Sequence, residues 1–242
     1  MKLNQREVIT MLNDTDAIQR YPLRHPVNTN LHLHYDDTFE GSRLMADKGP
    51  FILKYLANLK RTIELAMAEY PRVLVFRVDL RLPQGIELPD YAYTNQVISR
   101  FFESFTKKIQ YHQERVAERG YSRGCKVRYV WSREIGQGGK PHYHLLILLN
   151  RDAYYTIGRL GSDRVNMISR IEDSWAGALG LPVGQVRGLV HIPKDAEYRV
   201  NREIRRDEVD ELPKLFYRAS YLCKKATKSY GARQRGFGSS RG

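Results

Sequence analysis

The sequence has little of what marks a secreted or membrane protein. It has two cysteines, Cys125 and Cys223, and no C-x-x-C pair. A disulfide framework and a zinc ribbon are therefore not indicated, and we expect both thiols to be reduced. The longest apolar run, residues 145–149, is far too short to cross a bilayer, and residues 1–7 lack the apolar region of a signal peptide. We therefore expect a cytoplasmic protein.

Acidic residues are few in relation to basic ones. The chain has 40 Lys or Arg and 27 Asp or Glu, which gives a net charge of +13 and a pI near 9.7. Such an excess of positive charge suits a polyanionic partner. Nucleic acid fits better than a membrane, because the sequence has no strongly amphipathic basic segment or lipidation signal. A hydrophobic content of 42% and a length of 242 residues are enough for one sizeable core.

Apolar periodicity predicts alternating strands and helices. Strand-like alternation marks residues 72–83, 126–134, 142–149 and 185–191, and helical spacing marks residues 51–70, 93–119 and 162–179. After the first helix, the order is strand, helix, strand, strand, helix, strand, which is a split β-α-β arrangement. We therefore predict an α+β fold with an antiparallel sheet of ferredoxin-like or RRM-like topology and helices on one face.

A histidine pair that enters an apolar run is the most informative motif. In residues 140–149, Lys-Pro-His-Tyr-His-Leu-Leu-Ile-Leu-Leu, the strand period places His142 and His144 on one face. Neutral imidazole is a common ligand of divalent metals, and a rigid strand sets two rings at a spacing that one ion can bridge. We predict Glu134 as the third ligand, because residues 136–139, Gly-Gln-Gly-Gly, form a tight turn that folds it back beside the histidines. The simpler alternative is a polar strand end that happens to carry two histidines.

Two other segments carry side chains that could bind a metal. Residues 32–34, His-Leu-His, lie among turn-forming residues, so we expect an exposed segment there rather than a second metal site. In the strand 72–83, Arg77, Asp79 and Arg81 share the face opposite the apolar one. Asp79 is a weaker candidate for the metal site, and an ion pair with Arg77 or Arg81 is the better supported role for it.

The last predicted helix carries a second group of reactive side chains. Helical spacing in residues 215–228 places Tyr217 and Tyr221 on one face, with Lys224 or Lys225 one turn further on. The last thirty residues include eight Lys or Arg and no Asp or Glu, so a phosphate would meet an uncompensated positive field. The alternative for two aromatic residues at helical spacing is simple packing in a core.

A metal site, paired tyrosines, a following lysine and a large positive charge together indicate phosphodiester transesterification. A tyrosine hydroxyl, with an ordinary pKa of about 10, is protonated at neutral pH and must be activated. A covalent phosphotyrosine conserves the bond, so the strand can be rejoined without ATP. A divalent ion, Mg²⁺ or Mn²⁺, can polarise the scissile phosphate while Lys224 supports its non-bridging oxygens.

These residues resemble the HUH endonucleases, in particular the two-tyrosine rolling-circle replication initiators, including the inovirus-type gene II proteins of phages and prophages. His142-Tyr143-His144 matches the His-hydrophobic-His motif, although tyrosine is less apolar than the usual middle residue. Residues 217–224 match the Y-x-x-x-Y-x-x-K helix. The resemblance covers residues 73–228, with both motifs in the order found in that superfamily.

The resemblance implies a metal-dependent endonuclease and strand transferase for single-stranded DNA. Such an enzyme nicks by tyrosine attack, forms a 5′-phosphotyrosine intermediate and rejoins the strand, initiating rolling-circle replication. In the related initiators one tyrosine starts the round and the other resolves it. The implied partners are an origin or hairpin as single-stranded DNA, and helicase and polymerase of a bacterial host. The implied organisation is an N-terminal extension with a packed helix (1–70), a nuclease domain (71–230) and a flexible basic tail (231–242).

Five cations are predicted to contact the DNA strand. They are Arg77, Arg81, Arg218, Lys225 and Lys228. Two alternatives stay open. One is a non-catalytic strand-binding module, because the split β-α-β fold also binds single-stranded nucleic acid, although such modules present aromatic platforms on their central strands. The other is a transposase or relaxase with the same chemistry, for which a single tyrosine would be the better sign.

Overall fold

A computed structural model describes residues 22–121, 123–136, 138–159, 161–162, 165–226 and 234–241. Its largest sheet has six strands in the order β10-β6-β7-β5-β8, with β9 also paired to β5. Neighbouring strands in this sheet are antiparallel, which confirms the predicted α+β class. Its strands are β5 (Arg72–Arg81), β6 (Arg128–Ile135), β7 (Pro141–Asn150), β8 (Val190–His191), β9 (Glu197–Asn201) and β10 (Phe237–Ser239).

The described residues also form four α-helices and several short elements. The helices are α2 (Leu53–Glu69), α3 (Asn95–Ala117), α4 (Met167–Leu179) and α5 (Leu212–Ala219). The short strands are β1 (Leu33–His34), β2 (Thr38–Phe39), β3 (Ser42–Arg43) and β4 (Phe51–Ile52). The 3₁₀ turns are η1 (Ala46–Lys48), η2 (Asp90–Tyr93), η3 (Val183–Gln185) and η4 (Ser220–Cys223).

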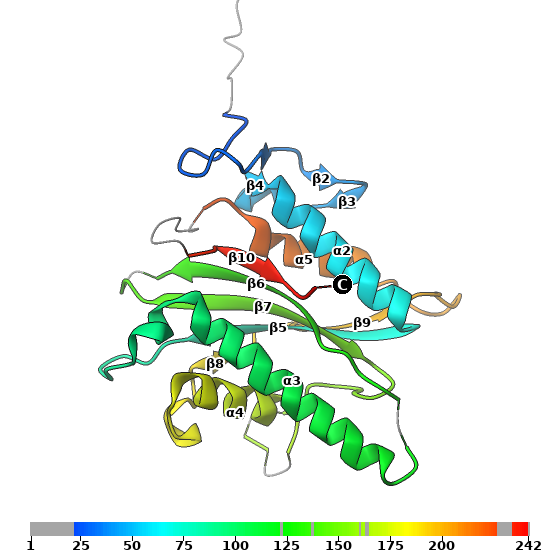
Figure 1. Cartoon of the computed structure of the whole chain (residues 1–242). Helices are drawn as coiled ribbons and strands as arrows, with labels where there is room; N and C mark the ends of the chain where they lie inside the picture. Colours follow the sequence, from blue (N-terminus) through cyan, green and yellow to red (C-terminus); the bar gives the residue numbers. More distant parts are fainter. Residues whose placement is uncertain are drawn as a thin grey trace, which may run out of the picture.

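Each face of the sheet has its own hydrophobic cluster, because side chains alternate along a strand. On β7, Leu145, Ile147 and Leu149 join the cluster that contains residues of α3 and α4. Leu146 and Leu148 join the cluster that contains residues of α2 and α5. Figure 1 shows α3 and α4 on one side of the sheet and α2 and α5 on the other.

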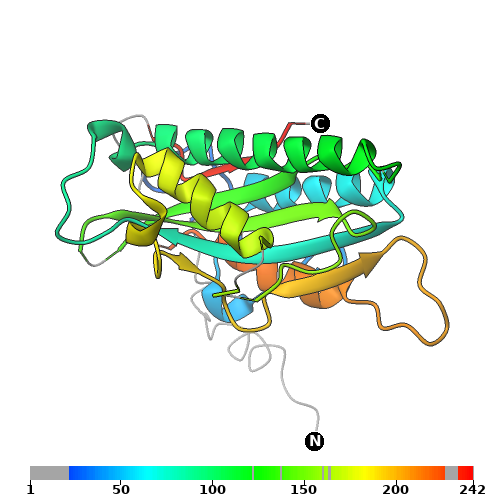
Figure 2. The ribbon, with the colours of Figure 1, turned by 90° about the horizontal axis from the view of Figure 1, so that it is seen from below.

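Helices therefore cover both faces of the sheet, whereas the sequence predicts them on one. The two helices of the split β-α-β unit, α3 and α4, do lie together on one face (Figure 2). The helices before and after that unit cover the opposite face. The reason is that β5 is buried on both sides: Arg77 and Asp79, expected to face ligand or water, are only 9% and 8% exposed. A strand buried in this way needs a layer on each face.

Two predicted elements are shorter than the sequence suggests. The strand predicted over 185–191 is reduced to β8, because a 3₁₀ turn at η3 and a left-handed Gly188 (φ 80°) occupy its first part. Helix α4 begins after Asn166, whose side chain forms a capping box with Ser169, whereas the sequence predicts a helix from residue 162.

The C-terminal segment contains a strand, although we expected a flexible tail over 231–242. Strand β10 pairs with β6 and places Phe237 opposite Ser132. The Phe237 ring is buried and stacks on Tyr55 of α2, with ring centroids 4.2 Å apart. A buried aromatic ring and an otherwise unpaired edge of β6 together explain why this segment joins the sheet.

The part of the predicted N-terminal extension that is described packs against the sheet. Strand β1 pairs with β4, and β2 and β3 form a hairpin whose two turn residues, Glu40 and Gly41, have positive φ angles of 46° and 79°. Leu33, Phe39 and Phe51 share a hydrophobic cluster with residues of β5, β6 and β7. Among the described residues, no helix is long and apolar enough to cross a membrane.

The packing of β10 predicts that the C-terminal segment contributes to stability. Phe237→Ala removes the ring that stacks on Tyr55, and we expect the free energy of unfolding to fall by about 3 kcal/mol. Urea denaturation measures this value. Arg241→Ala, an exposed change in the same segment, is the control and should shift it by no more than about 0.5 kcal/mol. Equal stability of the two variants would contradict a structural role for β10.

Candidate metal centre and tyrosine segment

Three neighbouring strands bring the polar side chains of the site together. The antiparallel register sets Glu134 of β6 opposite His142 of β7, and Asp79 of β5 opposite His144. Residues directly opposite one another on adjacent strands point to the same face of a sheet. The four side chains therefore gather on the face that α2 and α5 cover, although Asp79 and His144 are 65 residues apart in the chain.

Glu134, His142 and His144 form a group that could hold a metal ion. Each offers one ligand atom, and these atoms lie within 4.8 Å of one another. The Oε2 atom of Glu134 is 3.7 Å from Nε2 of His142 and 3.5 Å from Nε2 of His144. Nitrogen and oxygen ligands about 2.0–2.2 Å from a shared ion lie roughly 3–3.5 Å from one another, so these atoms are near the spacing that one ion needs. The same three residues were predicted from the sequence.

The environment of His144 also fits a metal ligand. Its Nδ1 atom is 2.7 Å from Oδ1 of Asp79, and a carboxylate in this position fixes the orientation of a metal-binding imidazole. Its Nε2 atom is buried and has no hydrogen-bond partner among the described residues. A buried polar atom without a partner costs free energy, and a metal ion beside Glu134 would satisfy it.

Asp79 and His144 stabilise one another in their charged forms. Burial by itself would raise the pKa of the Asp79 carboxyl, but the hydrogen bond with His144 and the charges of His144 and Arg77 hold that pKa below its ordinary value. Burial by itself would lower the pKa of His144, whereas the carboxylates of Asp79 and Glu134 raise it. Metals bind the neutral imidazole, so an ion and a proton compete for His144.

Asp79 has a different principal partner from the one predicted. The ion pair with Arg77 that the sequence favours is present at 3.9 Å, but Nδ1 of His144 lies closer to Asp79, at 2.7 Å. The second oxygen, Oδ2, is 3.5 Å from Nδ1 of His191, a half-exposed histidine at the end of β8. His191 is not among the site residues predicted from the sequence. It ends the strand predicted over 185–191, and the pairing of that strand with β5 places it beside Asp79.

Tyr221 lies beside the metal group, and Lys224 connects the two. The Lys224 ammonium donates a hydrogen bond to the Tyr221 hydroxyl at 2.5 Å and is 3.3 Å from Oε1 of Glu134. The Tyr221 ring meets the His144 ring edge-on, with centroids 5.5 Å apart, and the Arg77 guanidinium carbon is 5.7 Å from the Tyr221 centroid. Lys224 is only 6% exposed, so the ammonium is held in place by these contacts.

Tyr217 is placed differently from Tyr221. The sequence predicts one continuous helix, but α5 ends at Ala219 and the tighter 3₁₀ turn η4 follows. A 3₁₀ turn has 3.0 residues per turn instead of 3.6, so residues four apart no longer lie one above the other. Tyr217 is 36% exposed and lines a cavity between α2, α5 and β3 that Tyr221 does not line.

The structure describes three of the other four residues predicted to contact DNA. The guanidinium of Arg218 donates a hydrogen bond to the carbonyl of Lys194 at 3.3 Å. Arg81 is exposed at the end of β5, and Lys225 is half-buried with its backbone N–H bonded to the carbonyl of Pro50 at 2.8 Å. Lys228 lies outside the described residues.

The N-terminal region holds the segment that carries Tyr217 and Tyr221 in position. Lys224 forms an isolated β-bridge with Phe51, next to the bond between Lys225 and Pro50. The Ser220 hydroxyl donates to the carbonyl of Tyr217 and accepts the backbone N–H of Met45 at 3.1 Å. Residues 45–52 thus fix the chain on both sides of Tyr221, and no local pattern in the sequence indicates this arrangement.

Comparisons with known proteins give one family and one distant structural likeness. Residues 34–240 match the family described as the YagK/YfjJ C-terminal domain. Two proteins of Escherichia coli (strain K12) are each 32% identical to this chain: uncharacterized protein YfjJ, over 80% of this chain and 97% of YfjJ, and uncharacterized protein YagK, over 84% of this chain and 97% of YagK.

A solved structure, the N-terminal nuclease domain of minute virus of mice non-structural protein-1, is 11% identical and has a TM-score of 0.29. The match covers 64% of this chain and 76% of the viral one. A TM-score of this size does not establish a shared fold.

The geometry predicts that Glu134, His142 and His144 bind a divalent ion. Mn²⁺ or Mg²⁺ should raise the melting temperature of the wild-type protein, because an ion at 100 times its Kd stabilises the folded state by about 2.7 kcal/mol. His144→Ala should lose this shift, and Asp79→Asn should need a roughly 10- to 100-fold higher ion concentration. His32→Ala changes an exposed histidine away from the group and should behave as wild type. An unchanged shift in His144→Ala would contradict the assignment.

Proposed function

We propose that this chain, which belongs to the YagK/YfjJ C-terminal domain family, is a metal-dependent endonuclease that breaks one DNA strand by attack of Tyr221 on a phosphodiester. The observation that carries the proposal is the unbroken series of contacts from the Tyr221 hydroxyl through Lys224 to Glu134 and the histidines. A nucleophile, a cation and a metal-binding group thus lie together on one face of the sheet.

The chemistry follows from these contacts. The Lys224 ammonium, bonded to the Tyr221 hydroxyl, can hold a non-bridging phosphate oxygen beside the attacking atom. The tyrosyl oxygen releases its proton to solvent and forms a bond to phosphorus, the bond to the 3′-oxygen breaks, and the 3′-hydroxyl takes up a proton. Attack by a free 3′-hydroxyl on the resulting 5′-phosphotyrosine reverses the step and rejoins a strand.

The metal group has a defined part in this proposal. When bound, Mg²⁺ or Mn²⁺ would polarise the scissile phosphate and neutralise charge that develops on it. Glu134 contacts both the histidine pair and Lys224, because its Oε2 atom faces the two histidines and its Oε1 atom faces Lys224. This shared carboxylate keeps the lysine at a fixed position relative to the metal ligands.

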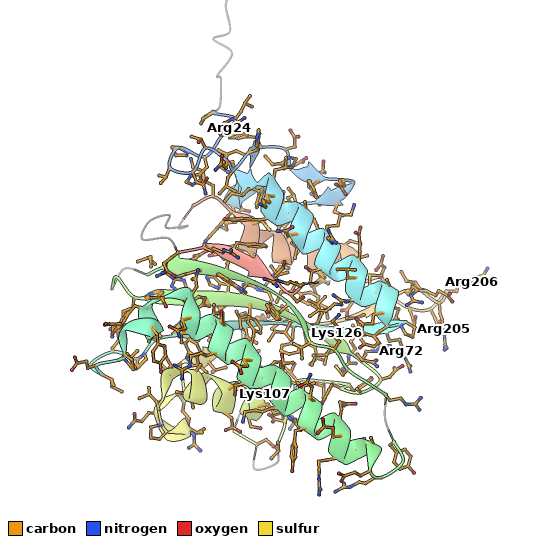
Figure 3. All side chains as sticks on the ribbon, viewed as in Figure 1. Arg24, Arg72, Lys107, Lys126, Arg205 and Arg206 are labelled. Carbon is orange, nitrogen blue, oxygen red and sulfur yellow. The ribbon has the colours of Figure 1, made fainter. Side chains whose placement is uncertain are left out.

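The charge of the protein supports single-stranded DNA as the substrate. The net charge is +13, and basic side chains such as Arg24, Lys107 and Arg205 project from widely separated parts of the surface (Figure 3). Arg77 lies at the Tyr221 ring, where a phosphate would approach. Most of the affinity should therefore come from phosphate contacts and fall with salt, whereas cleavage depends on the metal group.

The placement of the tyrosines favours a second candidate function, in which only one tyrosine reacts. A two-tyrosine initiator of rolling-circle replication needs Tyr217 and Tyr221 to reach the same phosphate, but only Tyr221 contacts the metal group in the described structure. A transposase or relaxase can use one tyrosine for the same chemistry. A replication role would additionally need helicase and polymerase from the host cell.

The proposal predicts a covalent adduct that depends on Tyr221. Incubation with single-stranded DNA and Mn²⁺ should give a protein–DNA species on a denaturing gel, and EDTA should prevent it. Tyr221→Phe should abolish the adduct, and Tyr217→Phe, the matched control, should retain it. A two-tyrosine reaction would instead leave adduct in both single variants and remove it only in the double variant. An adduct that persists in the double variant would place the nucleophile elsewhere.

The contacts of Lys224 predict a large kinetic effect. Lys224→Ala removes the cation from the Tyr221 hydroxyl and should slow adduct formation about 10²- to 10³-fold. The control is Lys225→Ala, because the Lys225 side chain is half-buried and makes no described contact with Tyr221. Single-turnover rates measured at saturating DNA separate this effect from binding. Equal rates for the two variants would rule out the assigned role.

A further inference from the structure

A cavity of about 520 Å³ opens beside Tyr217, between α2, α5 and the β2–β3 hairpin. Ile63 and Met67 of α2 and Phe216 and Tyr217 of α5 provide apolar and aromatic walls. Its volume lies within the range of roughly 300–1,000 Å³ that is usual for ligand sites. The nuclease chemistry proposed above does not use this cavity.

We propose that the cavity binds one base of the DNA strand, next to the phosphate that Tyr221 attacks, and that Tyr217 stacks on this base. The inference rests on the proposed function, because the strand is placed by the phosphate at Tyr221. It assigns to Tyr217 a substrate-binding role instead of a second attack. The base of any nucleotide has an aromatic face, so such a site tolerates different sequences.

The charges at the cavity favour a nucleotide over an apolar partner. Arg43 and Lys214 lie on its lining with exposed side chains, and neither makes an ion pair within the described ranges. Lys60 is less available, because its ammonium pairs with Glu40 at 2.5 Å and approaches Glu64 at 3.9 Å. Apolar and aromatic walls with free cations at the opening match a base and its flanking phosphates.

The position of the cavity also fits a strand that reaches Tyr221. Tyr217 precedes Tyr221 by about one turn, and the two residues face the cavity and the metal group respectively.

The test compares binding of two probes with the metal removed by EDTA, so that cleavage plays no part. One probe is fluorescein-labelled oligothymidylate, and the other is an oligomer of the same length and backbone without bases. The wild-type protein should prefer the probe with bases. Met67→Trp fills the cavity and should reduce that preference by roughly 5- to 100-fold, the effect expected for one stacked base. Ala57→Trp adds the same ring at an exposed position of α2 outside the cavity and should retain the preference.

Two variants of Tyr217 separate stacking from other roles. Tyr217→Phe keeps the ring and should bind both probes as wild type, whereas Tyr217→Ala should lose the same preference as Met67→Trp. A preference unchanged in Met67→Trp and Tyr217→Ala would overturn the proposal. So would Met67→Trp weakening both probes equally, because the cavity would then act on the backbone or through the fold.

The outcome is distinguishable from failure of the nuclease proposal. Loss of base preference in Met67→Trp combined with an adduct that requires Tyr221 supports both proposals. If an adduct requires Tyr221 but the cavity variants keep the preference for the probe with bases, the base site is overturned and the nuclease proposal stands. If the cavity has no effect on the binding of either probe but binds an apolar peptide, it is assigned to a protein partner. This result overturns the base site.

Discussion

The register of the three central strands is the constraint on which the site depends. Glu134 faces His142 and Asp79 faces His144 only because β6, β7 and β5 pair in this alignment. A shift of one residue in any strand would turn its polar side chain to the α3 and α4 face, where the opposing cluster is apolar. Leu145, directly after His144, packs on that face and so stabilises the alignment that builds the metal group.

The site lies within a buried face, which determines how its charges are arranged. The Asp79 carboxylate contacts His144 on one side and His191 on the other, and Lys224 neutralises one oxygen of Glu134. Buried charges cost free energy unless each has a partner, so these pairs form a connected group. Tyr221 lies beside this group, because its hydroxyl accepts a hydrogen bond from Lys224 and its ring meets His144.

The two tyrosines have different surroundings because the helix type changes between them. Helix α5 supplies Tyr217, and the 3₁₀ turn η4 supplies Tyr221 and turns it toward His144. Residues 45–52 hold this turn through the hydrogen bond from the Met45 backbone N–H to the Ser220 hydroxyl and through the β-bridge between Phe51 and Lys224. The N-terminal region therefore contributes both to the position of Tyr221 and, through β3 and α2, to the cavity that Tyr217 lines.

The sequence by itself determined the features that depend on local periodicity. The two-residue repeat of a strand put His142 and His144 on one face, and a glycine-rich turn returned Glu134 to them. These features depend on residues that lie close together in the sequence, so the sequence alone predicts them. The pairing of Asp79 with His144, the bridge from Phe51 to Lys224, and the stacking of Phe237 on Tyr55 join distant segments. Only the tertiary structure decided these three contacts. Packing across the whole chain sets which strands are neighbours and which faces of the sheet are buried, and no local repeat in the sequence encodes either feature.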